Sequence, residues 1–402
     1  MRTAAVAFVL SCLCAAVLTP VVRRLALKWG LVDQAWSSRK IHSHPVPRLG
    51  GIALILAFFA PLLGLLVFES AVGRIFYAEQ RLAIGLFVGG SLIGLLGLYD
   101  DLRGTSAQKK LAIQFAVAGL VYAFGFRIDI VANPFGDPIA LGFAGLPFTL
   151  LWIVGVINAM NLIDGLDGLA GGVALVAVAT TFGIAFHRGE PSMILICAAL
   201  SGAIIGFLFY NFNPASIFMG DTGSMFLGFI LATGAIRTHQ KSSTAVAVLV
   251  PTIALGLPIL DALLAVSRRA MRGRPLFRAD KEHIHHRLLA TGLSHRQAVL
   301  VLYGLCIVFG GIAMVLAYSN GVQTAVLLTI LAGLSFLFLR RIGFMRTARA
   351  GSLLAIRRRG LEQRFALELL GERLRFAVTP GDIWSAVRDA SVALGATAVR
   401  LE

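Results

Sequence analysis

The sequence predicts an all-α polytopic membrane protein with about 11 transmembrane helices, the N-terminus outside the cytoplasm and the C-terminus inside. The chain has 402 residues, of which 57% are apolar and only 14% charged, whereas soluble globular proteins carry about 25% charged residues. Its mean hydropathy is +0.83, and apolar runs long enough to cross a bilayer recur along it. This composition excludes a soluble domain, and also a disordered chain, which would be polar and highly charged.

The predicted helices coincide with the apolar runs, because about 20 apolar residues are needed to cross a bilayer core. The first run is followed by Arg23 and Arg24 and has no clear small-residue cleavage site, which favours a membrane anchor over a cleaved signal peptide. Two or three runs are short or interrupted by glycine. The runs lie near residues 3–22, 49–68, 82–99, 111–126, 146–163, 169–186, 193–210, 222–236, 243–266, 297–317 and 321–339.

The charges predict the orientation of these helices. The formal net charge is +16, and with the helices above, 29 of the 36 Lys and Arg residues fall on the face that carries the C-terminus. The positive-inside rule makes that face cytoplasmic, so the basic excess is first a topology signal and not a nucleic-acid surface. Connections on the opposite face are mostly short; the exception is 127–145, whose Pro, Gly and alternating apolar residues predict a small hairpin.

The chain is expected to divide into a transmembrane domain, 1–340, and a basic cytoplasmic tail, 341–402. Near the end of the tail, the sequence predicts a helix that Asp382 caps close to its start, followed by a short strand. This pair resembles the opening of a truncated α/β sensor domain such as a GAF domain; an oligomerising or membrane-lying basic helix is the alternative. Four cysteines lie inside apolar runs, where small core residues are expected and not disulfides or metal ligands: Cys12, Cys14, Cys197 and Cys306.

Acidic, amide and imidazole side chains gather at the cytoplasmic ends of different predicted helices. Ionisable groups at membrane depth are expensive and usually functional. The parity that places them on one face follows from hydropathy and charge alone, so it is independent of the motifs. The motifs are GLYDDLRG at 97–104, NAMNLIDGLDGLAGG at 158–172, NFNPASIFMGDTGS at 211–224, RPLFRADKEHIHHRLL at 274–289 and RKIHSHPVPRLGG at 39–51.

Three carboxylates predict a divalent-cation site. Asp100 and Asp101 are adjacent, and Asp221 belongs to another helix end. Mg²⁺ takes one or two carboxylates together with substrate phosphate oxygens, and no Cys–His arrangement suits zinc, so Mg²⁺ or Mn²⁺ is expected. A solvated loop is the alternative for the adjacent pair alone. Asp261, inside the ninth run, either supports the site from behind or makes a polar contact between helices.

The motif at 158–172 places polar side chains on one face of a helix end. Asn158, Asn161 and Asp164 recur every three residues, and Asp167 continues the spacing beyond a glycine at which the helix opens. A simple Asn/Asp helix cap is the alternative. The backbone amides that follow Asp221 lie near a helix N-terminus, which favours binding of a phosphate.

Histidines and loop cations complete the candidates. His283, His285 and His286 can carry positive charge near a phosphate or act as acid or base; a metal cluster and an ordinary surface loop are the alternatives. Lys40 and His42 lie in a loop that suits an anionic head group or a substrate phosphate, although a basic loop at a membrane surface is often only a topology signal.

Taken together, the motifs resemble those of the polyprenyl-phosphate N-acetylhexosamine-1-phosphate transferase family. The resemblance rests on GLYDDLRG, NAMNLIDGLDGLAGG, NFNPASIFMGDTGS and RADKEHIHHRLL and covers roughly residues 1–340. It implies transfer of a HexNAc-1-phosphate from a UDP-sugar to a polyprenyl phosphate, with Mg²⁺ and release of UMP. The family includes enzymes that begin peptidoglycan, O-antigen and teichoic-acid linkage synthesis.

The resemblance also implies roles for individual residues. The implied metal ligands are Asp100, Asp101 and Asp221. The implied catalytic residues are Asp100, Asp101, Asp164, Asp167, His283, His285 and His286. The implied substrate-binding residues are Lys40, His42, Lys110, Asn158, Asn161, Asn211, Arg287 and Phe218, the last stacking on uracil, with simple packing as the alternative.

Two departures favour the GlcNAc-1-phosphate branch of the family over its phospho-MurNAc-pentapeptide branch. The peptidoglycan enzyme has a lysine three residues after its second acid, where this chain has Gly104, preceded by Arg103. That enzyme also has a His-His-His-Phe type of ending, whereas this chain continues as HIHHRLL. The expected donor is therefore UDP-GlcNAc.

The expected partners are a UDP-N-acetylhexosamine, undecaprenyl phosphate and the lipid bilayer, without nucleic acid; a homodimer is left open. The expected location is the bacterial inner (cytoplasmic) membrane, with multiple spans and a cytoplasmic active site. A secondary transporter of a polar solute is the rival from another functional class. Transporters place ionisable groups near the midplane and often contain inverted repeats, whereas here the acids lie at helix ends and no repeat is visible.

Overall fold

The computed structural model describes residues 1–33, 46–67, 79–131, 139–240, 249–271, 283–319, 321–343 and 365–394. Most of these residues are helical, and their strands form only two small antiparallel pairs. Among them, 7 helices are long and apolar enough to cross a membrane. The predicted class, an all-α polytopic membrane protein, is confirmed. The total of eleven spans and their orientation remain predictions.

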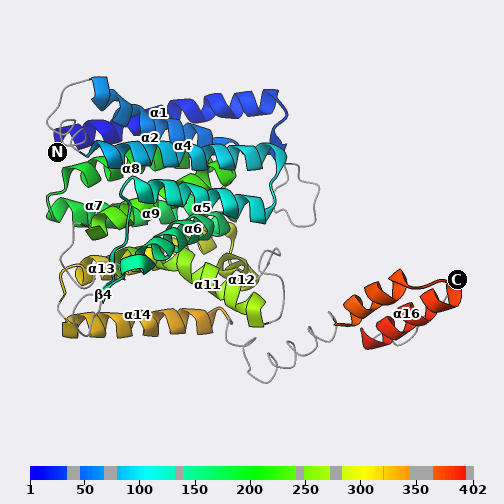
Figure 1. The fold of residues 1–402 in the computed structure, drawn as a ribbon. Helices are drawn as coiled ribbons and strands as arrows, with labels where there is room; N and C mark the ends of the chain where they lie inside the picture. Colours follow the sequence, from blue (N-terminus) through cyan, green and yellow to red (C-terminus); the bar gives the residue numbers. More distant parts are fainter. Residues whose placement is uncertain are drawn as a thin grey trace. The chain divides into compact units, whose positions relative to one another are not determined.

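Every predicted apolar run corresponds to helix in the structure (Figure 1). Ten of the runs correspond to single helices, and the ninth is divided. The single helices are α1 (Arg2–Lys28), α2 (Gly50–Val67), α4 (Gln80–Arg103), α5 (Ala107–Ala123), α6 (Gly145–Ile163), α7 (Leu169–His187), α8 (Pro191–Asn211), α9 (Gly220–Gln240), α13 (His295–Leu316) and α14 (Gly321–Arg341).

The ninth run differs from its prediction as one continuous helix. It contains α10 (Leu249–Ala254) and α11 (Gly256–Met271), separated at Leu255. Pro258 explains the break, because it has no N–H to donate to the carbonyl four residues earlier and its ring crowds that turn. At the break Gly256 lies against α13, where an added Cβ would come within 2.6 Å of Phe309.

The central helix of the bundle is α9, which packs against α2, α4, α6 and α7. Nearly all its side chains from residue 222 to 236 are buried, as expected for a helix that is apolar all round. Its first turn meets two neighbours backbone to backbone. A Cβ added to Gly51 of α2 would lie 2.2 Å from Gly223 N, and one added to Gly97 of α4 would lie 2.5 Å from Thr222 Cα.

Helix α1 belongs to the same bundle and packs closely on α8. Two glycines one turn apart on α8 make this possible, because a Cβ on Gly202 would lie 2.1 Å from Phe8 O and one on Gly206 would lie 2.3 Å from Cys12 O. Small residues at this spacing let membrane helices approach each other. The four cysteines are free; Cys197 and Cys306 are buried, whereas Cys12 and Cys14 are half-buried.

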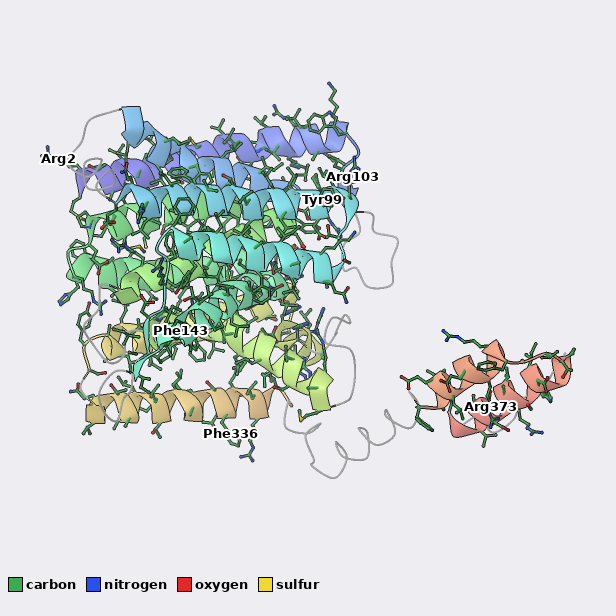
Figure 2. All side chains as sticks on the ribbon, in the orientation of Figure 1. Arg2, Tyr99, Arg103, Phe143, Phe336 and Arg373 are labelled. Carbon is green, nitrogen blue, oxygen red and sulfur yellow. The ribbon has the colours of Figure 1, made fainter. Side chains whose placement is uncertain are left out.

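The two ends of the bundle differ in character. Figure 2 shows Arg2 at one end and Tyr99 and Arg103 at the other. The predicted hairpin is confirmed: β3 (Ile130–Val131) pairs with β4 (Ile139–Ala140). The described residues of the polar motifs lie at the end marked by Arg103, where hydrogen bonds join the end of α4, the start of α5, the end of α6 and the start of α9. A second antiparallel pair was not predicted: β1 (Val32–Asp33) with β2 (Val46–Pro47).

The chain forms two compact units: Met1–Ala262 with His283–Ser335, and Leu263–Glu282 with Phe336–Glu402. The predicted domain boundary at residue 340 remains a prediction. In the tail, α16 (Pro380–Ala393) forms where a helix was predicted, but its cap differs. Thr379 is the N-cap, and the Asp382 carboxylate accepts a hydrogen bond from the Thr379 amide at 2.9 Å, completing a capping box. The predicted strand after α16 lies outside the described residues.

Candidate active site

A lysine joins two of the three carboxylates of the predicted cation site. Asp100 sits in the last turn of α4, Lys110 in the first turn of α5 and Asp221 in the first turn of α9. Lys110 Nζ lies 2.8 Å from Asp100 Oδ2 and 2.5 Å from Asp221 Oδ2. All three side chains are largely buried, with 15–28% of their surface exposed, so the ion pairs are shielded from solvent screening.

Asp101 occupies a different environment from its neighbour Asp100. Asp101 Oδ1 accepts a hydrogen bond from the Asp221 amide at 2.9 Å. Its Oδ2 accepts from the Thr222 amide at 2.9 Å and from the Thr222 hydroxyl at 2.6 Å. Both oxygens of Asp101 are therefore bonded to the first turn of α9.

The donor set fits a hard divalent cation at Asp100 and Asp221. Asp100 Oδ1 is buried, and no hydrogen-bond partner for it exists among the described residues. A buried carboxylate oxygen without a partner is costly unless a cation or donor meets it. Among the described residues, no group of three or more His, Cys, Asp or Glu side chains is arranged to hold a metal ion. The set of three predicted ligands stays a prediction.

The end of α6 contributes one side chain to this cluster and one to the bundle interior. Asn161 donates from Nδ2 to Ser224 Oγ at 3.0 Å, in the first turns of α9. Asn158 lies one turn earlier, and its Nδ2 donates to Gln114 Oε1 of α5 at 2.7 Å. Asn161 therefore lies beside the carboxylates, whereas Asn158 connects α5 and α6.

Asp164 directly follows α6 and adds another carboxyl group near Asp221. Burial, followed by the charges of Asp221 and Asp101, raises the pKa of Asp164 to about 8. Its carboxyl is therefore mostly protonated at neutral pH unless a positive charge approaches it. A carboxyl group whose pKa is strongly shifted within a cluster of acids is a candidate functional group.

Asp167 and Asn211 hold two loops together. Asp167 Oδ2 accepts from Asn213 Nδ2 and from the Ala215 amide, both at 3.0 Å. Asn211 Oδ1 accepts from the Gly168 amide at 3.1 Å, and its Nδ2 donates to Ile217 O at 2.9 Å. Both side chains are more than nine-tenths buried. Their contacts link the loop after α6 to the loop before α9.

The histidine motif is anchored by Asp261 of α11. His283 Nδ1 lies 3.0 Å from Asp261 Oδ2, and the Ile284 amide donates to Asp261 Oδ1 at 2.9 Å. Asp261 and His283 are both buried. This carboxylate orients the start of α12 (Ile284–Ala290), the short helix that carries the other two histidines.

His285 brings this motif against the loop after α6. A Cβ added to Gly165 would lie 2.4 Å from His285 Nε2, so glycine is required for the two segments to approach. His285 is 2% exposed, and its Nδ1 has no hydrogen-bond partner within the described part of the chain. Its ring lies 4.3 Å from that of His286. Through this contact, the loop that carries Asp164 and Asp167 lies against the histidine motif.

We expect His285 to make the protein sensitive to acid. Burial, followed by repulsion from His286, lowers the pKa of His285 from 6.5 to about 3. Between these values the unfolded chain binds a proton that the folded chain excludes, so stability falls as pH falls, by up to about 2 kcal/mol at pH 5. The melting temperature of His285→Gln should drop less between pH 7.5 and pH 5 than that of the wild type. A drop equal to that of the wild type would contradict this; His187→Gln, which removes an exposed histidine of α7, is the control.

The remaining predicted residues are placed as follows. The Phe218 amide donates to Pro47 O at 2.7 Å, and Phe218 O accepts from the Gly50 amide at 2.9 Å, so its backbone continues the edge of β2 while its side chain is half-buried. Arg287 lies half-buried on α12. Lys40 and His42 fall outside the described residues. The roles of all the predicted site residues stay predictions.

Four residues of this end were not among the predicted site. Gln114 and Ser224 accept hydrogen bonds from the side-chain amides of Asn158 and Asn161, respectively. His295 accepts at Nε2 from the Asp167 amide at 3.0 Å. Tyr303 donates from its hydroxyl to Gly168 O at 2.6 Å. Local sequence gives no signal for Tyr303, because it lies in an ordinary apolar run.

Comparison with known proteins places the chain among membrane sugar-phosphate transferases. A family model described as glycosyl transferase family 4 matches residues 83–239, the stretch that carries every acid and side-chain amide described for this site except Asp261. The chain is also similar to a probable undecaprenyl-phosphate N-acetylglucosaminyl 1-phosphate transferase of Bacillus subtilis (strain 168). The identity is 41% over 312 residues, covering 77% of this chain and 84% of the relative.

Two further relatives extend the comparison. A decaprenyl-phosphate N-acetylglucosaminephosphotransferase of Mycobacterium tuberculosis (strain ATCC 25618 / H37Rv) is 34% identical over 318 residues, covering 71% of this chain and 75% of the relative. A phospho-N-acetylmuramoyl-pentapeptide-transferase of Listeria welshimeri is 31% identical over 322 residues, covering 77% of this chain and 95% of the relative.

Proposed function

Since the chain belongs to glycosyl transferase family 4, we propose that it transfers N-acetylglucosamine-1-phosphate from a UDP-sugar to undecaprenyl phosphate and releases UMP. One observation carries the proposal: Lys110 holds Asp100 and Asp221 together at one end of a membrane bundle. That end suits a reaction between a water-soluble diphosphate and a lipid phosphate. The excess of cations on the same face supports a cytoplasmic active site in the bacterial inner membrane.

The choice of donor sugar is supported by the relatives and by Gly104. Both N-acetylglucosamine-1-phosphate transferases above are more similar to this chain than the pentapeptide transferase is. Gly104 ends α4 with φ of 71° and ψ of 147°, a conformation that essentially only glycine adopts. The lysine expected at this place in the pentapeptide branch would be strained on this backbone.

Asp100 and Asp221 are the residues that would hold Mg²⁺ or Mn²⁺. The partnerless Asp100 Oδ1 supports this assignment, as does the preference of Mg²⁺ for one or two carboxylates plus phosphate oxygens. A divalent cation bound there would neutralise the donor diphosphate and polarise the phosphorus under attack.

The reaction itself requires mainly positioning and charge. A lipid-phosphate oxygen forms a bond to the sugar-bearing phosphorus, and the bond from that phosphorus to the UMP oxygen breaks. Phosphoryl transfer gains most from alignment and charge stabilisation. Lys110 supplies a fixed positive charge between the acids. His285 is neutral at physiological pH. It can therefore donate one hydrogen bond and accept another, but it contributes no charge.

A transfer assay tests the proposal directly. The full chain in detergent, with undecaprenyl phosphate, UDP-GlcNAc and Mg²⁺, should yield one UMP for each GlcNAc-diphospho-lipid. Removing the divalent cation with EDTA should stop both products, and Mn²⁺ should restore them. UDP-MurNAc-pentapeptide in place of UDP-GlcNAc should give no more than background, since the site lacks the lysine noted above.

The rival transporter predicts the opposite pattern. In proteoliposomes, uptake of a UDP-sugar without any lipid product or UMP release would contradict the transferase and favour transport. Stoichiometric UMP release in detergent, where no compartments exist, would exclude transport as the explanation.

A further inference from the structure

We propose that Asp101 is a positioning residue: it caps α9 from a neighbouring helix and so sets where Asp221 stands relative to Asp100. The catalytic consequence rests on the proposed function, but the cap itself does not. The two adjacent acids then have different roles. Asp100 faces the cation, and Asp101 holds the backbone that carries the other ligand, Asp221.

The N-terminus of α9 needs a cap from another part of the chain. The first amides of a helix have no partner within the helix, and a side-chain oxygen usually accepts from them. Gly220, the first residue of α9, has no side chain and a φ of +70°. The acceptor must therefore come from elsewhere, and Asp101 supplies it through the bonds to the Asp221 and Thr222 amides.

The Asp101 carboxylate fits closely against the backbone of Gly220. A Cβ added to Gly220 would lie 2.5 Å from Asp101 Oδ2 and 2.3 Å from Arg48 O, so the missing side chain is what admits the carboxylate. A negative charge at a helix N-terminus is also favoured by the helix dipole. The contact is thus a built one, shaped by both the glycine and the acid.

The side chains of Asp100 and Asp101 point in different directions. Successive residues of a helix point about 100° apart, given 3.6 residues per turn. Asp100 therefore faces Lys110 and keeps one oxygen without a partner in the described ranges, whereas Asp101 faces the start of α9. Asp101 Oδ1 accepts from the backbone amide of Asp221. A shift of Asp101 therefore moves the backbone of Asp221, and the proposed ligand carboxylate moves with it.

Thr222 offers a test that leaves every carboxylate in place. Its hydroxyl donates to Asp101 Oδ2 at 2.6 Å, and the residue is 1% exposed. Thr222→Val keeps the shape and removes this donor, while Thr222→Ser keeps the donor. Thr233→Val is the matched control: it removes another buried hydroxyl of α9, one that donates to Phe229 O and Ile230 O within its own helix.

The experiment uses the full chain in detergent without nucleotide or lipid. Hydrogen exchange of the peptide covering the first turn of α9 and the affinity for Mn²⁺ are measured in each variant. Thr222→Val and Asp101→Asn should speed exchange, and Thr222→Val should weaken Mn²⁺ binding about tenfold, as expected for one hydrogen bond to a charged acceptor. Thr222→Ser and Thr233→Val should match the wild type. Asp100→Asn should lose Mn²⁺ binding with unchanged exchange.

Two results would overturn the proposal. The first is wild-type exchange and Mn²⁺ affinity in Thr222→Val. The second is loss of Mn²⁺ binding in Asp101→Asn without faster exchange, which would make Asp101 a direct ligand. Neither measurement requires transfer, so a failed transfer assay leaves this test standing. A wild type that binds no Mn²⁺ would overturn the assignment of the cation pair, and the exchange data would still decide whether Asp101 is the cap.

Discussion

Replacing Asp221 with Asn should lower the rate of sugar-phosphate transfer by roughly 10³-fold, the scale of losing one strong electrostatic contact to a transition state. The amide keeps the shape of the side chain but removes the charge that faces Lys110 and the proposed cation. Stability should change little, since the lost ion pair with Lys110 is offset by relief of the repulsion between Asp221 and Asp100. The measurement is UMP release at saturating UDP-GlcNAc, with the melting temperature recorded in parallel.

The matched control for this variant is Asp129→Asn. Asp129 is an exposed acid next to β3, at the end of the bundle away from the candidate site. Its replacement removes one negative charge from the chain and should leave the transfer rate unchanged. A rate for Asp221→Asn within tenfold of the wild type would remove Asp221 from the proposed cation pair.

Replacing Gly51 with Ala should be strongly damaging, although Gly51 lies outside the site. The new methyl group would stand 2.2 Å from Gly223 N and 2.6 Å from Gly223 Cα, and backbone atoms cannot rotate away as a flexible side chain would. Overpacking of this kind destabilises by about 1–3 kcal/mol. Because α9 must move, Asp221 moves with it, and a displacement near 1 Å can lower the rate by on the order of 10²-fold.

Gly64→Ala controls for the substitution type within the same helix. Gly64 belongs to α2, and among the described residues no atom outside the neighbouring backbone of its own helix lies within 4 Å of the place that an added Cβ would take. Alanine there should keep the transfer rate and leave the melting temperature equal or higher, because alanine favours helix over glycine by about 0.5–1 kcal/mol. Equal melting temperatures and rates for the two variants would show that α2 and α9 tolerate separation.

The helices were largely predictable from the sequence because hydropathy is a local property. A run such as 193–210 identifies α8 without knowledge of its neighbours, and proline and glycine mark where the runs end. The break at Leu255 was missed, although Pro258 is visible in the sequence, because a proline inside an apolar run either kinks or divides a membrane helix. The neighbouring helix decides between the two, and here α13 packs at the break.

The candidate residues were predictable, but their partners were not. Asp100 and Asp101 are indistinguishable by type and spacing, yet one faces Lys110 and the other caps α9. Asp167 was grouped with Asp164, but its carboxylate is bonded to the loop before α9. These partners lie on other helices and loops, and no local pattern in the sequence specifies which of them a given acid will meet.

By itself, the sequence determined that this protein is a helical membrane protein, which runs form the helices of the bundle and that the acids, amides and histidines share one end. Apolar length, charge bias and motif spacing carry that information because each depends on neighbouring residues only. The tertiary structure alone decided which acid meets the lysine and which one holds a helix. The direction of each side chain follows from where α9 packs, and glycines such as Gly51 and Gly97 set that packing by admitting its backbone.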